Sequence, residues 1–222
     1  MISANRPFIA RAALFDLDGT LADTAPDLAA AVNQMRILRG MEPAPYAQLR
    51  PHASAGARGL LAAGFGVSPD DAEFEPMRIE FLNNYENAIC QNSVLFNGIS
   101  ELIQQLNRRQ IPWGIVTNKA ARFTQPLIPL LGLQQAACII SGDTTPYSKP
   151  HPEPLFEAAR QLRITPQECC YLGDDLRDIQ AAQAAGMHSV AVTWGYCGQT
   201  EPQQWNADLL LNVPSELIQL LF

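Results

Sequence analysis

The sequence is short of positive charge. Its 15 lysine and arginine residues stand against 22 aspartate and glutamate residues, which gives a formal net charge of −7 and a pI of about 4.9. Nucleic-acid-binding proteins usually present a basic face, and so do proteins that adhere to anionic membranes. The acidic balance therefore predicts that neither nucleic acid nor a membrane is a partner. A small anionic substrate stays possible, because a few local cations or a metal ion can reverse the field inside a pocket.

Long apolar runs and cysteine motifs are also lacking. No stretch approaches the roughly 20 apolar residues that span a membrane, and the N-terminal segment does not have the pattern of a signal peptide. The five cysteines are odd in number and form no Cys-x-x-Cys pair, which favours reduced, structural thiols. These absences together predict a cytoplasmic protein. With 222 residues, 47% of them hydrophobic, the chain can fill one core, or a core and a smaller module.

Strand and helix patterns alternate strictly from residue 95 onward. The strict alternation predicts βαβ units, a parallel sheet and helices on both faces of that sheet. We therefore expect an α/β fold with a doubly wound parallel sheet. The expected strands are 9–15, 112–117, 137–142, 169–174 and 189–193, and the helices that follow residue 95 are expected at about 98–109, 120–131, 153–163, 176–185 and 214–221.

The segment after the first strand is mostly helical in pattern. Apolar residues recur at helical spacing over about 26–40 and again over 72–90. A helix of small residues is expected around 58–64, and the proline- and glycine-containing stretch 40–56 predicts loops. This helical block is expected to be an insertion into the sheet-forming unit. We place the sheet-forming core at 1–23 and 94–222, and the helical insertion at 24–93.

Polar residues gather where the expected strands end, and the carboxyl ends of parallel strands meet at one edge of a sheet. A strand-terminal Asp is by itself often a turn former or a helix N-cap, and a lone loop lysine is usually solvated. The convergence of all these groups at one rim favours a site instead. They are Asp16-Leu17-Asp18 after the first strand, Thr117-Asn118-Lys119 after the second, Lys149 in the loop after the third and Gly173-Asp174-Asp175 after the fourth.

Clustered carboxylates favour a divalent cation, and oxygen ligands with a few waters suit Mg²⁺, which usually arrives with a phosphate. A carboxylate beside such an ion can attack phosphorus to give an aspartyl phosphate. A second carboxyl two residues on can protonate the leaving oxygen and later take a proton from water. A hydroxyl and a lysine can stabilise the phosphoryl oxygens.

Four segments, in this order, resemble the motifs of the haloacid dehalogenase-like (HAD) hydrolase superfamily: "DLDGTLADT", "VTNK", "SKPHPEP" and "GDDLRDI". The resemblance spans nearly the whole chain. It implies a Rossmann-like core with a helical cap inserted after the first motif, in agreement with the helical block already inferred. It also implies Mg²⁺-dependent chemistry at the strand ends.

The same resemblance implies a role for each matching residue. Asp16 is the expected nucleophile, and Asp18 is the expected general acid and base. Thr117 and Asn118 are expected to bind the phosphoryl group, and Lys149 is expected to steady both the nucleophile and the phosphate.

The metal site follows from the resemblance in the same way. The Asp16 carboxylate, the Asp18 main-chain carbonyl and Asp174 are the expected Mg²⁺ ligands. Asp175 could help through a water, and Asp178 matches the last acidic position of the fourth motif, beyond the ligands themselves. Arg177 is interpreted as a surface residue.

Two positions, and the similarity of several longer stretches to known phosphatases, narrow the class of substrate. Asp18 favours a phosphomonoester, because the dehalogenase and phosphonatase branches lack Asp there, and Thr20 favours a phosphatase over the sugar-phosphate mutases. Longer stretches are similar to bacterial phosphoglycolate phosphatases, especially a sub-branch that acts on N-acetylmuramic acid 6-phosphate in cell-wall recycling. Both substrates carry a carboxylate. Arg58 in the loop "HASAGARG" is its candidate partner, unless it is an exposed arginine at a helix start, and Gly19 is counted with the substrate-binding residues.

Other functions stay open on the sequence alone. A sugar-phosphate mutase or a broad-specificity sugar phosphatase would use the same superfamily motifs. A phospho-acceptor receiver domain also combines Asp, Thr, Lys and Mg²⁺, but receivers are shorter and lack the inserted cap. An inactive scaffold should have lost one of the core groups, and none is missing. The expected partner is a small-molecule phosphate ester, and the chain is expected to be a monomer or a homodimer.

Overall fold

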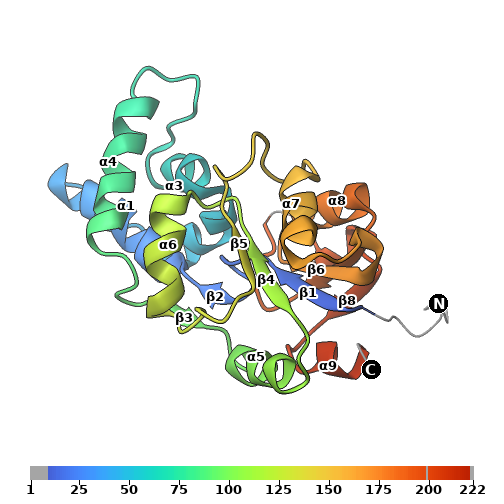
Figure 1. Cartoon of the computed structure of the whole chain (residues 1–222). Helices are drawn as coiled ribbons and strands as arrows, with labels where there is room; N and C mark the ends of the chain where they lie inside the picture. The colour runs from blue at the N-terminus through green and yellow to red at the C-terminus, as the bar shows by residue number, and fades with distance from the viewer. Residues whose placement is uncertain (1–9, 199, 221–222) are drawn as a thin grey trace.

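A six-stranded parallel sheet forms the centre of the chain (Figure 1). The structure, a computed structural model, describes residues 10–198 and 200–220, so the expected core segment before residue 10 lies outside the described residues. The strands are β1 Ala12–Phe15, β4 Trp113–Val116, β5 Cys138–Ile140, β6 Cys169–Gly173, β7 His188–Val192 and β8 Leu209–Leu211, in the spatial order β5-β4-β1-β6-β7-β8. The chain direction across the sheet reverses beside β1, which makes this the doubly wound fold that was expected.

Helices cover both faces of the sheet because its central strands are apolar on both sides. Ala12 and Leu14 pack on one face against α7 and α8, while Ala13 and Phe15 pack on the other against α5, α6 and α9. A strand buried on both faces is the usual element of a parallel sheet. The helix bounds are α5 Ile99–Arg108, α6 Ala121–Leu130, α7 Glu153–Leu162, α8 Leu176–Ala185 and α9 Glu216–Leu220.

A second layer of helices forms the cap, which has an apolar cluster of its own (Figure 1). Its elements are α1 Ala25–Leu38, α2 Tyr46–Leu49, the 3₁₀ helix η1 Arg50–Ala55, α3 Gly56–Phe65 and α4 Phe74–Asn87. The expectation of loops over 40–56 is wrong for much of that stretch. Short helical turns form there because Leu49 and Ala53 are buried among the cap helices. The proline in the first turn of η1 is compatible with a helix start.

Two short strands that the sequence did not reveal join the cap to the sheet. Strand β2 Ala22–Asp23 pairs in antiparallel fashion with β3 Val94–Leu95. Both connections between cap and core therefore run side by side through one small ladder. The predicted cap limits, residues 24 and 93, fall beside it.

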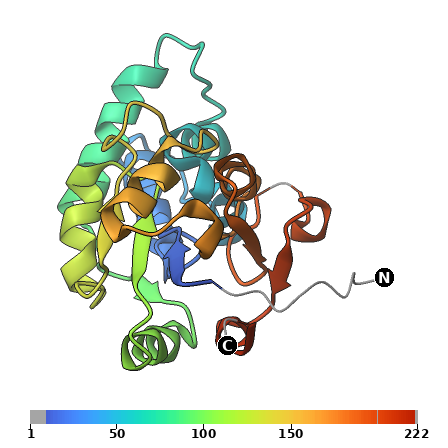
Figure 2. The same ribbon diagram turned by 45° about the vertical axis from the view of Figure 1, so that its right-hand side comes forward.

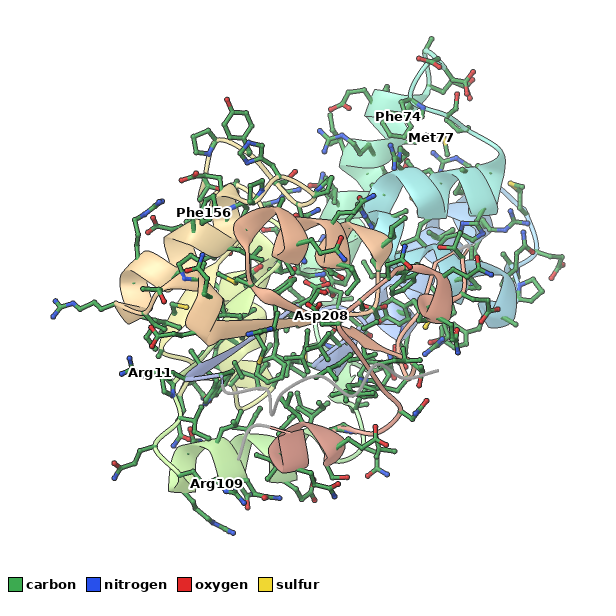
Figure 3. The ribbon with its side chains drawn as sticks, turned by 90° about the vertical axis from the view of Figure 1, so that its right-hand side faces the viewer. Arg11, Phe74, Met77, Arg109, Phe156 and Asp208 are labelled. Carbon is green, nitrogen blue, oxygen red and sulfur yellow. The ribbon has the colours of Figure 1, made fainter. Side chains whose placement is uncertain are left out.

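The cap and the helices α5 and α9 lie at opposite ends of the molecule (Figure 2). Figure 3 shows Phe74 and Met77 of α4 in the cap, far from Arg109 at the end of α5. The carboxyl ends of the strands face the cap. In the described part of the chain, no helix has the length and apolar character needed to cross a membrane.

Candidate active site

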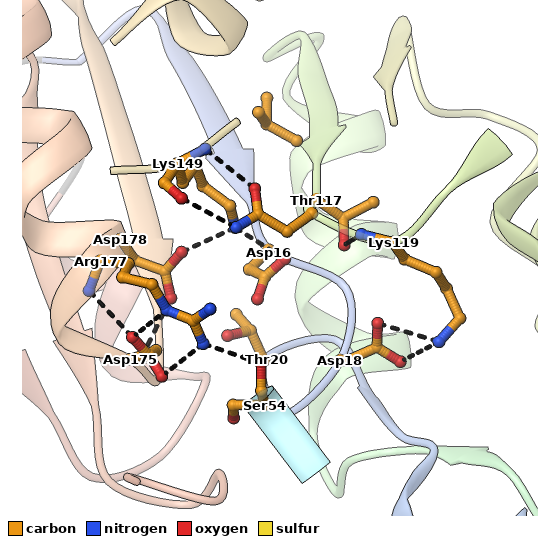
Figure 4. Close-up of polar contacts among 12 residues, drawn as sticks. Asp16, Asp18, Thr20, Ser54, Thr117, Lys119, Lys149, Asp175, Arg177 and Asp178 are labelled. Atoms are coloured by element: carbon orange, nitrogen blue, oxygen red, sulfur yellow. Dashed lines mark hydrogen bonds and ion pairs between the residues drawn. The ribbon is translucent and has the colours of Figure 1, made fainter. Parts of the chain in front are cut away.

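A cavity of about 560 Å³ lies between the carboxyl ends of the strands and the cap. Its floor contains Asp16, Asp18, Thr117 and Lys149, and residues of η1, α3 and α4 form the opposite side. The polar residues that were expected to meet at this edge of the sheet are therefore brought together. Figure 4 shows them as two groups, one around Lys149 and one around Lys119.

Asp16 is held directly beyond β1 by the sheet itself. Its main-chain N–H donates to the carbonyl of Leu172 on β6 at 2.9 Å, so its side chain enters the cavity from a fixed backbone. The ammonium of Lys149 lies 2.9 Å from Asp16 Oδ1 and donates to Asp178 Oδ1 and to the Tyr171 hydroxyl, both at 2.7 Å. Burial alone lowers the pKa of Lys149, but the two carboxylates outweigh it and raise that pKa. A charged lysine is thus fixed beside Asp16.

Three buried carboxylates meet at this point. Asp16, Asp174 and Asp178 can each offer an oxygen within 4.8 Å of the others. Burial, opposed by Lys149 and aided by Asp178, raises the pKa of Asp16 to about 7, and burial together with Asp16 and Asp178 raises the pKa of Asp174 well above its usual value. The excess of negative charge is unfavourable without a further cation.

The donor set fits a hard divalent cation. Asp16 Oδ1 is buried beside the Lys149 ammonium, 2.9 Å away, and accepts no other hydrogen bond from the described residues. Asp174 accepts one hydrogen bond from Thr20 Oγ1 at 3.1 Å and one from the main-chain N–H of Tyr196 at 2.8 Å, and it keeps lone pairs for another partner. Asp178 instead accepts from Lys149, Tyr171 and the main chain of Asp175. Asp16 and Asp174 are therefore the carboxylates best suited to Mg²⁺, whose preferred ligands are oxygens.

Asp18 belongs to the second group of Figure 4. Its carboxylate points toward Lys119, whose Nζ lies 2.9 and 3.1 Å from the two oxygens. The hydroxyl of Thr24, at the start of the cap, also donates to Asp18. Burial alone lowers the pKa of Lys119, and the Asp18 carboxylate outweighs it, so the pKa is raised.

Thr117 and Asn118 leave β4 at the cavity floor. The Thr117 hydroxyl accepts from the main-chain N–H of Lys119 at 3.1 Å, which leaves its O–H free to donate. The Asn118 side chain donates to the Lys149 carbonyl and accepts from the Lys149 N–H, both at 2.9 Å. Asn118 thereby ties the loop after β5 to the end of β4 and places Lys149.

Gly19 turns the chain out of the sheet, with a φ of +87°. A side chain at this position would overlap the carboxylate of Asp174. Gly19 is not among the residues that line the cavity. Its geometry accounts for the turn and for the close approach of Asp174.

Arg177 and Asp178 lie in the first turn of α8, which begins at Leu176. Asp178 is buried and accepts a hydrogen bond from the Lys149 ammonium. Asp175 caps the helix by accepting from the Arg177 N–H at 2.9 Å, and it also binds the Arg177 guanidinium. The guanidinium donates in turn to the carbonyl of Ser54 in the cap at 2.7 Å. The interpretation of Arg177 as a surface residue is wrong, because its side chain is only 32% exposed, lines the cavity and contacts the cap.

The sequence pattern of the family described as "Haloacid dehalogenase-like hydrolase" matches residues 13–192 of the chain. The chain belongs to this haloacid dehalogenase-like hydrolase family. The expected superfamily is thus confirmed over most of the sequence, the cap included.

Relatives within the family are similar to this hydrolase over almost their whole length. A phosphoglycolate phosphatase of Xanthomonas campestris is 47% identical over 209 residues, which covers 93% of this chain and 94% of the relative. An N-acetylmuramic acid 6-phosphate phosphatase of Pseudomonas aeruginosa is 41% identical over 213 residues, with 95% and 94% covered. A crystal structure of a predicted phosphoglycolate phosphatase from Haemophilus somnus superimposes with a TM-score of 0.83 at 25% identity, covering 95% of this chain and 97% of that one.

Arg58, an expected substrate-binding residue, does not join the group at the strand ends. Its side chain is exposed on α3 and does not line the cavity. The cations that do line it are Arg78, Lys119, Arg122, Lys149 and Arg177. In the sequence, Lys119 directly follows Thr117 and Asn118 at the same strand end. The family resemblance implied a role for each of those two residues but none for Lys119.

Proposed function

We propose that this hydrolase is an Mg²⁺-dependent phosphomonoesterase that acts on a carboxylated phosphate ester through a covalent phosphate on Asp16. The observation that carries the proposal is the placement of Asp16 against buried Lys149 on the floor of a cavity, with a second carboxylate, Asp18, two residues further on. A nucleophile, a cation for the phosphoryl oxygens and a proton carrier are the groups that this reaction needs.

In the first step an Asp16 oxygen attacks phosphorus, a P–O bond to Asp16 forms, and the P–O bond to the ester oxygen breaks. Asp18 gives its proton to the departing oxygen, so an alcohol leaves. Asp18 then takes a proton from water, the water oxygen bonds to phosphorus, and the bond to Asp16 breaks to release phosphate. Lys149 and the Thr117 hydroxyl hold the phosphoryl oxygens in both steps.

Mg²⁺ would be held by the carboxylates of Asp16 and Asp174, with the Asp18 carbonyl as the further expected ligand. When bound, it supplies positive charge that offsets repulsion between the anionic nucleophile and the phosphoryl oxygens. Asp178 keeps Lys149 charged and in place. Thr20 and the main chain of Tyr196 orient Asp174.

The size of the cavity favours the larger of the two substrates named for the relatives. Phosphoglycolate is a two-carbon ester, whereas a cavity of about 560 Å³ is in the range that holds drug-sized ligands. Leu28, Ile79 and Leu82 of the cap give the cavity an apolar wall. Such a wall suits a sugar ring and an acetyl group, which supports N-acetylmuramic acid 6-phosphate.

The test is phosphate release by the purified protein with Mg²⁺ on phosphoglycolate, N-acetylmuramic acid 6-phosphate, N-acetylglucosamine 6-phosphate and p-nitrophenyl phosphate. We expect the muramic acid derivative to have the highest kcat/KM. Asp16→Asn should lower kcat by about four orders of magnitude, because the nucleophile is lost, while Asp70→Asn at an exposed cap position should not. Near-normal turnover by Asp16→Asn would exclude the covalent mechanism, and a preference for phosphoglycolate would overturn the choice of substrate.

A further inference from the structure

The cations around the cavity differ in whether their anionic partner has to move during the reaction. Three of them keep a carboxylate that has only a holding role: Lys149, which also contacts Asp16, keeps Asp178, Arg177 keeps Asp175 and Arg78 keeps Glu75. Arg122 lies 3.9 Å from Glu86, and its side chain is 47% exposed. Lys119 alone among these cavity cations is paired with Asp18, the residue to which the proposed reaction assigns proton transfer.

The pair of Lys119 and Asp18 faces away from the nucleophile. Figure 4 shows the Asp18 carboxylate directed at Lys119 rather than at Asp16, and both of its oxygens contact the ammonium. To protonate an ester oxygen at Asp16, the carboxyl has to turn and give up this contact. Lys119 is then a buried ammonium, with 8% of its side chain exposed, and it has lost its counterion, which is strongly unfavourable.

We propose that Lys119 recognises the carboxylate of the substrate, which takes the place of Asp18 on the ammonium. The released Asp18 carboxylate then takes up a proton from solvent, and this is the proton that it gives to the leaving oxygen. This inference rests on the proposed function, since it concerns the same ester. It makes Lys119 a specificity-determining residue. An ester without a carboxylate leaves Asp18 bound to Lys119.

Tyr85 of the cap supplies a second group to the same position. Its ring lies 4.8 Å from Lys119 Nζ, and its side chain also lines the cavity. The hydroxyl is buried and has no hydrogen-bond acceptor for its O–H among the described residues. A carboxylate bound to Lys119 can accept from this hydroxyl, which would satisfy a donor that is otherwise unpaired.

The exchange predicts where discrimination appears in the kinetics. The substrate carboxylate is needed to free Asp18, so its contribution should appear in kcat/KM, which reports the steps up to departure of the alcohol. We expect a charge-assisted hydrogen bond in this buried site to raise kcat/KM for the carboxylated ester about tenfold to a hundredfold.

The experiment compares matched esters that differ in the carboxylate. The pairs are N-acetylmuramic acid 6-phosphate with N-acetylglucosamine 6-phosphate, and phosphoglycolate with 2-hydroxyethyl phosphate. The ratio of kcat/KM within each pair is measured for the wild type, Lys119→Met, Lys119→Arg, Arg122→Met and Arg58→Met. We expect Lys119→Met to lower the ratio at least tenfold in a pair that the wild type discriminates, Lys119→Arg to retain part of it, and Arg122→Met, which removes the same charge from an exposed position, to lower it far less.

The outcomes separate this inference from the proposed function. A ratio that Lys119→Met leaves unchanged, or that Arg122→Met lowers equally, overturns the role of Lys119. So does a loss of the ratio in Arg58→Met alone, which would place carboxylate recognition on the cap loop. A wild type that hydrolyses p-nitrophenyl phosphate but discriminates neither pair also contradicts the inference while the phosphatase proposal stands. No hydrolysis of any ester with Mg²⁺ contradicts the proposed function itself.

Discussion

Two buried lysines hold the two carboxylates to which the reaction is assigned, Lys149 beside Asp16 and Lys119 beside Asp18. Removing one partner of a buried ion pair typically costs about 3–5 kcal/mol, whereas an exposed pair such as Arg160 and Glu157 contributes little to stability. The difference arises because a buried charge that loses its partner cannot be solvated. Residues that satisfy these lysines should therefore affect the reaction without touching the substrate.

Asp178→Asn tests whether the carboxylate partner of Lys149 affects the reaction without touching the substrate. The substitution removes the carboxylate that lies 2.7 Å from the ammonium, and an amide oxygen is a weaker partner for a buried cation. We expect kcat to fall on the order of ten- to a hundredfold with a smaller change in KM, because Lys149 no longer holds its place beside Asp16. Steady-state kinetics measures both constants. Glu157→Gln, which breaks an exposed pair, is the control, and a kcat within twofold of wild type for Asp178→Asn would contradict the argument.

The local pattern was sufficient to find the residues at strand ends. Asp16, Thr117 and Asp174 each follow an apolar run directly, and Asp18 lies two residues after Asp16. The parallel sheet brings such positions together. The partners of these residues could not be found in this way. That Lys119 meets Asp18 depends on how two side chains turn across a sheet, and no spacing in the sequence encodes that direction.

At the scale of elements, the 3₁₀ helix η1 docks the cap onto the core. Arg50 of η1 donates to the carbonyl of Gly195 at 3.2 Å, and its guanidinium lies 5.0 Å from the centre of the Tyr196 ring. Arg177 of α8 reaches the Ser54 carbonyl from the other side. These contacts hold the cap over the cavity, so weakening them should favour an open arrangement.

Arg50→Met is the variant that tests the docking, because Arg50 does not line the cavity. We expect KM to rise about three- to tenfold, since part of the binding energy must then close the cap. Amide hydrogens of residues 50–55 should also exchange faster with solvent. Arg39→Met removes an ion pair with Glu80 within the cap and serves as the control. Equal exchange rates in wild type and Arg50→Met would show that η1 is held by other contacts.

Elements were predictable where they were long. The amphipathic helix α5 buries Ile99, Leu102, Ile103 and Leu106, a spacing that is visible in the sequence. Strands β2 and β3 have two residues each and β8 has three, too few to establish a period of two. These strands form because they pair with segments distant in the sequence. The helix η1 also depends on its surroundings, because burial by the cap helices favours its helical conformation.

At the scale of the whole molecule, the buried acidic cluster couples stability to pH and metal. Asp16 has a pKa of about 7 in the folded chain against an ordinary value of 3.8. Between about pH 4 and pH 7 the folded state therefore binds a proton that the unfolded state has lost. Folding stability contributed by this group is fully present below pH 4 and is lost as the pH rises through about 7. The raised pKa of Asp174 acts in the same direction.

Mg²⁺ should reverse this loss, because it favours the ionised carboxylates that burial disfavours. With a chelator present, we expect the Tm to fall between about pH 5 and pH 8. Saturating Mg²⁺ should raise the Tm at pH 8 and have little effect at pH 5, where protons compete for the same oxygens. At a hundred times Kd, a ligand that binds only the folded state adds about 2.7 kcal/mol, which thermal denaturation detects readily. Asp174→Asn should lose most of the Mg²⁺ response, whereas Asp208→Asn, on the far side of β7 from the cluster, should keep it. An equal rise in Tm for wild type and Asp174→Asn would mean that Mg²⁺ acts elsewhere on the molecule.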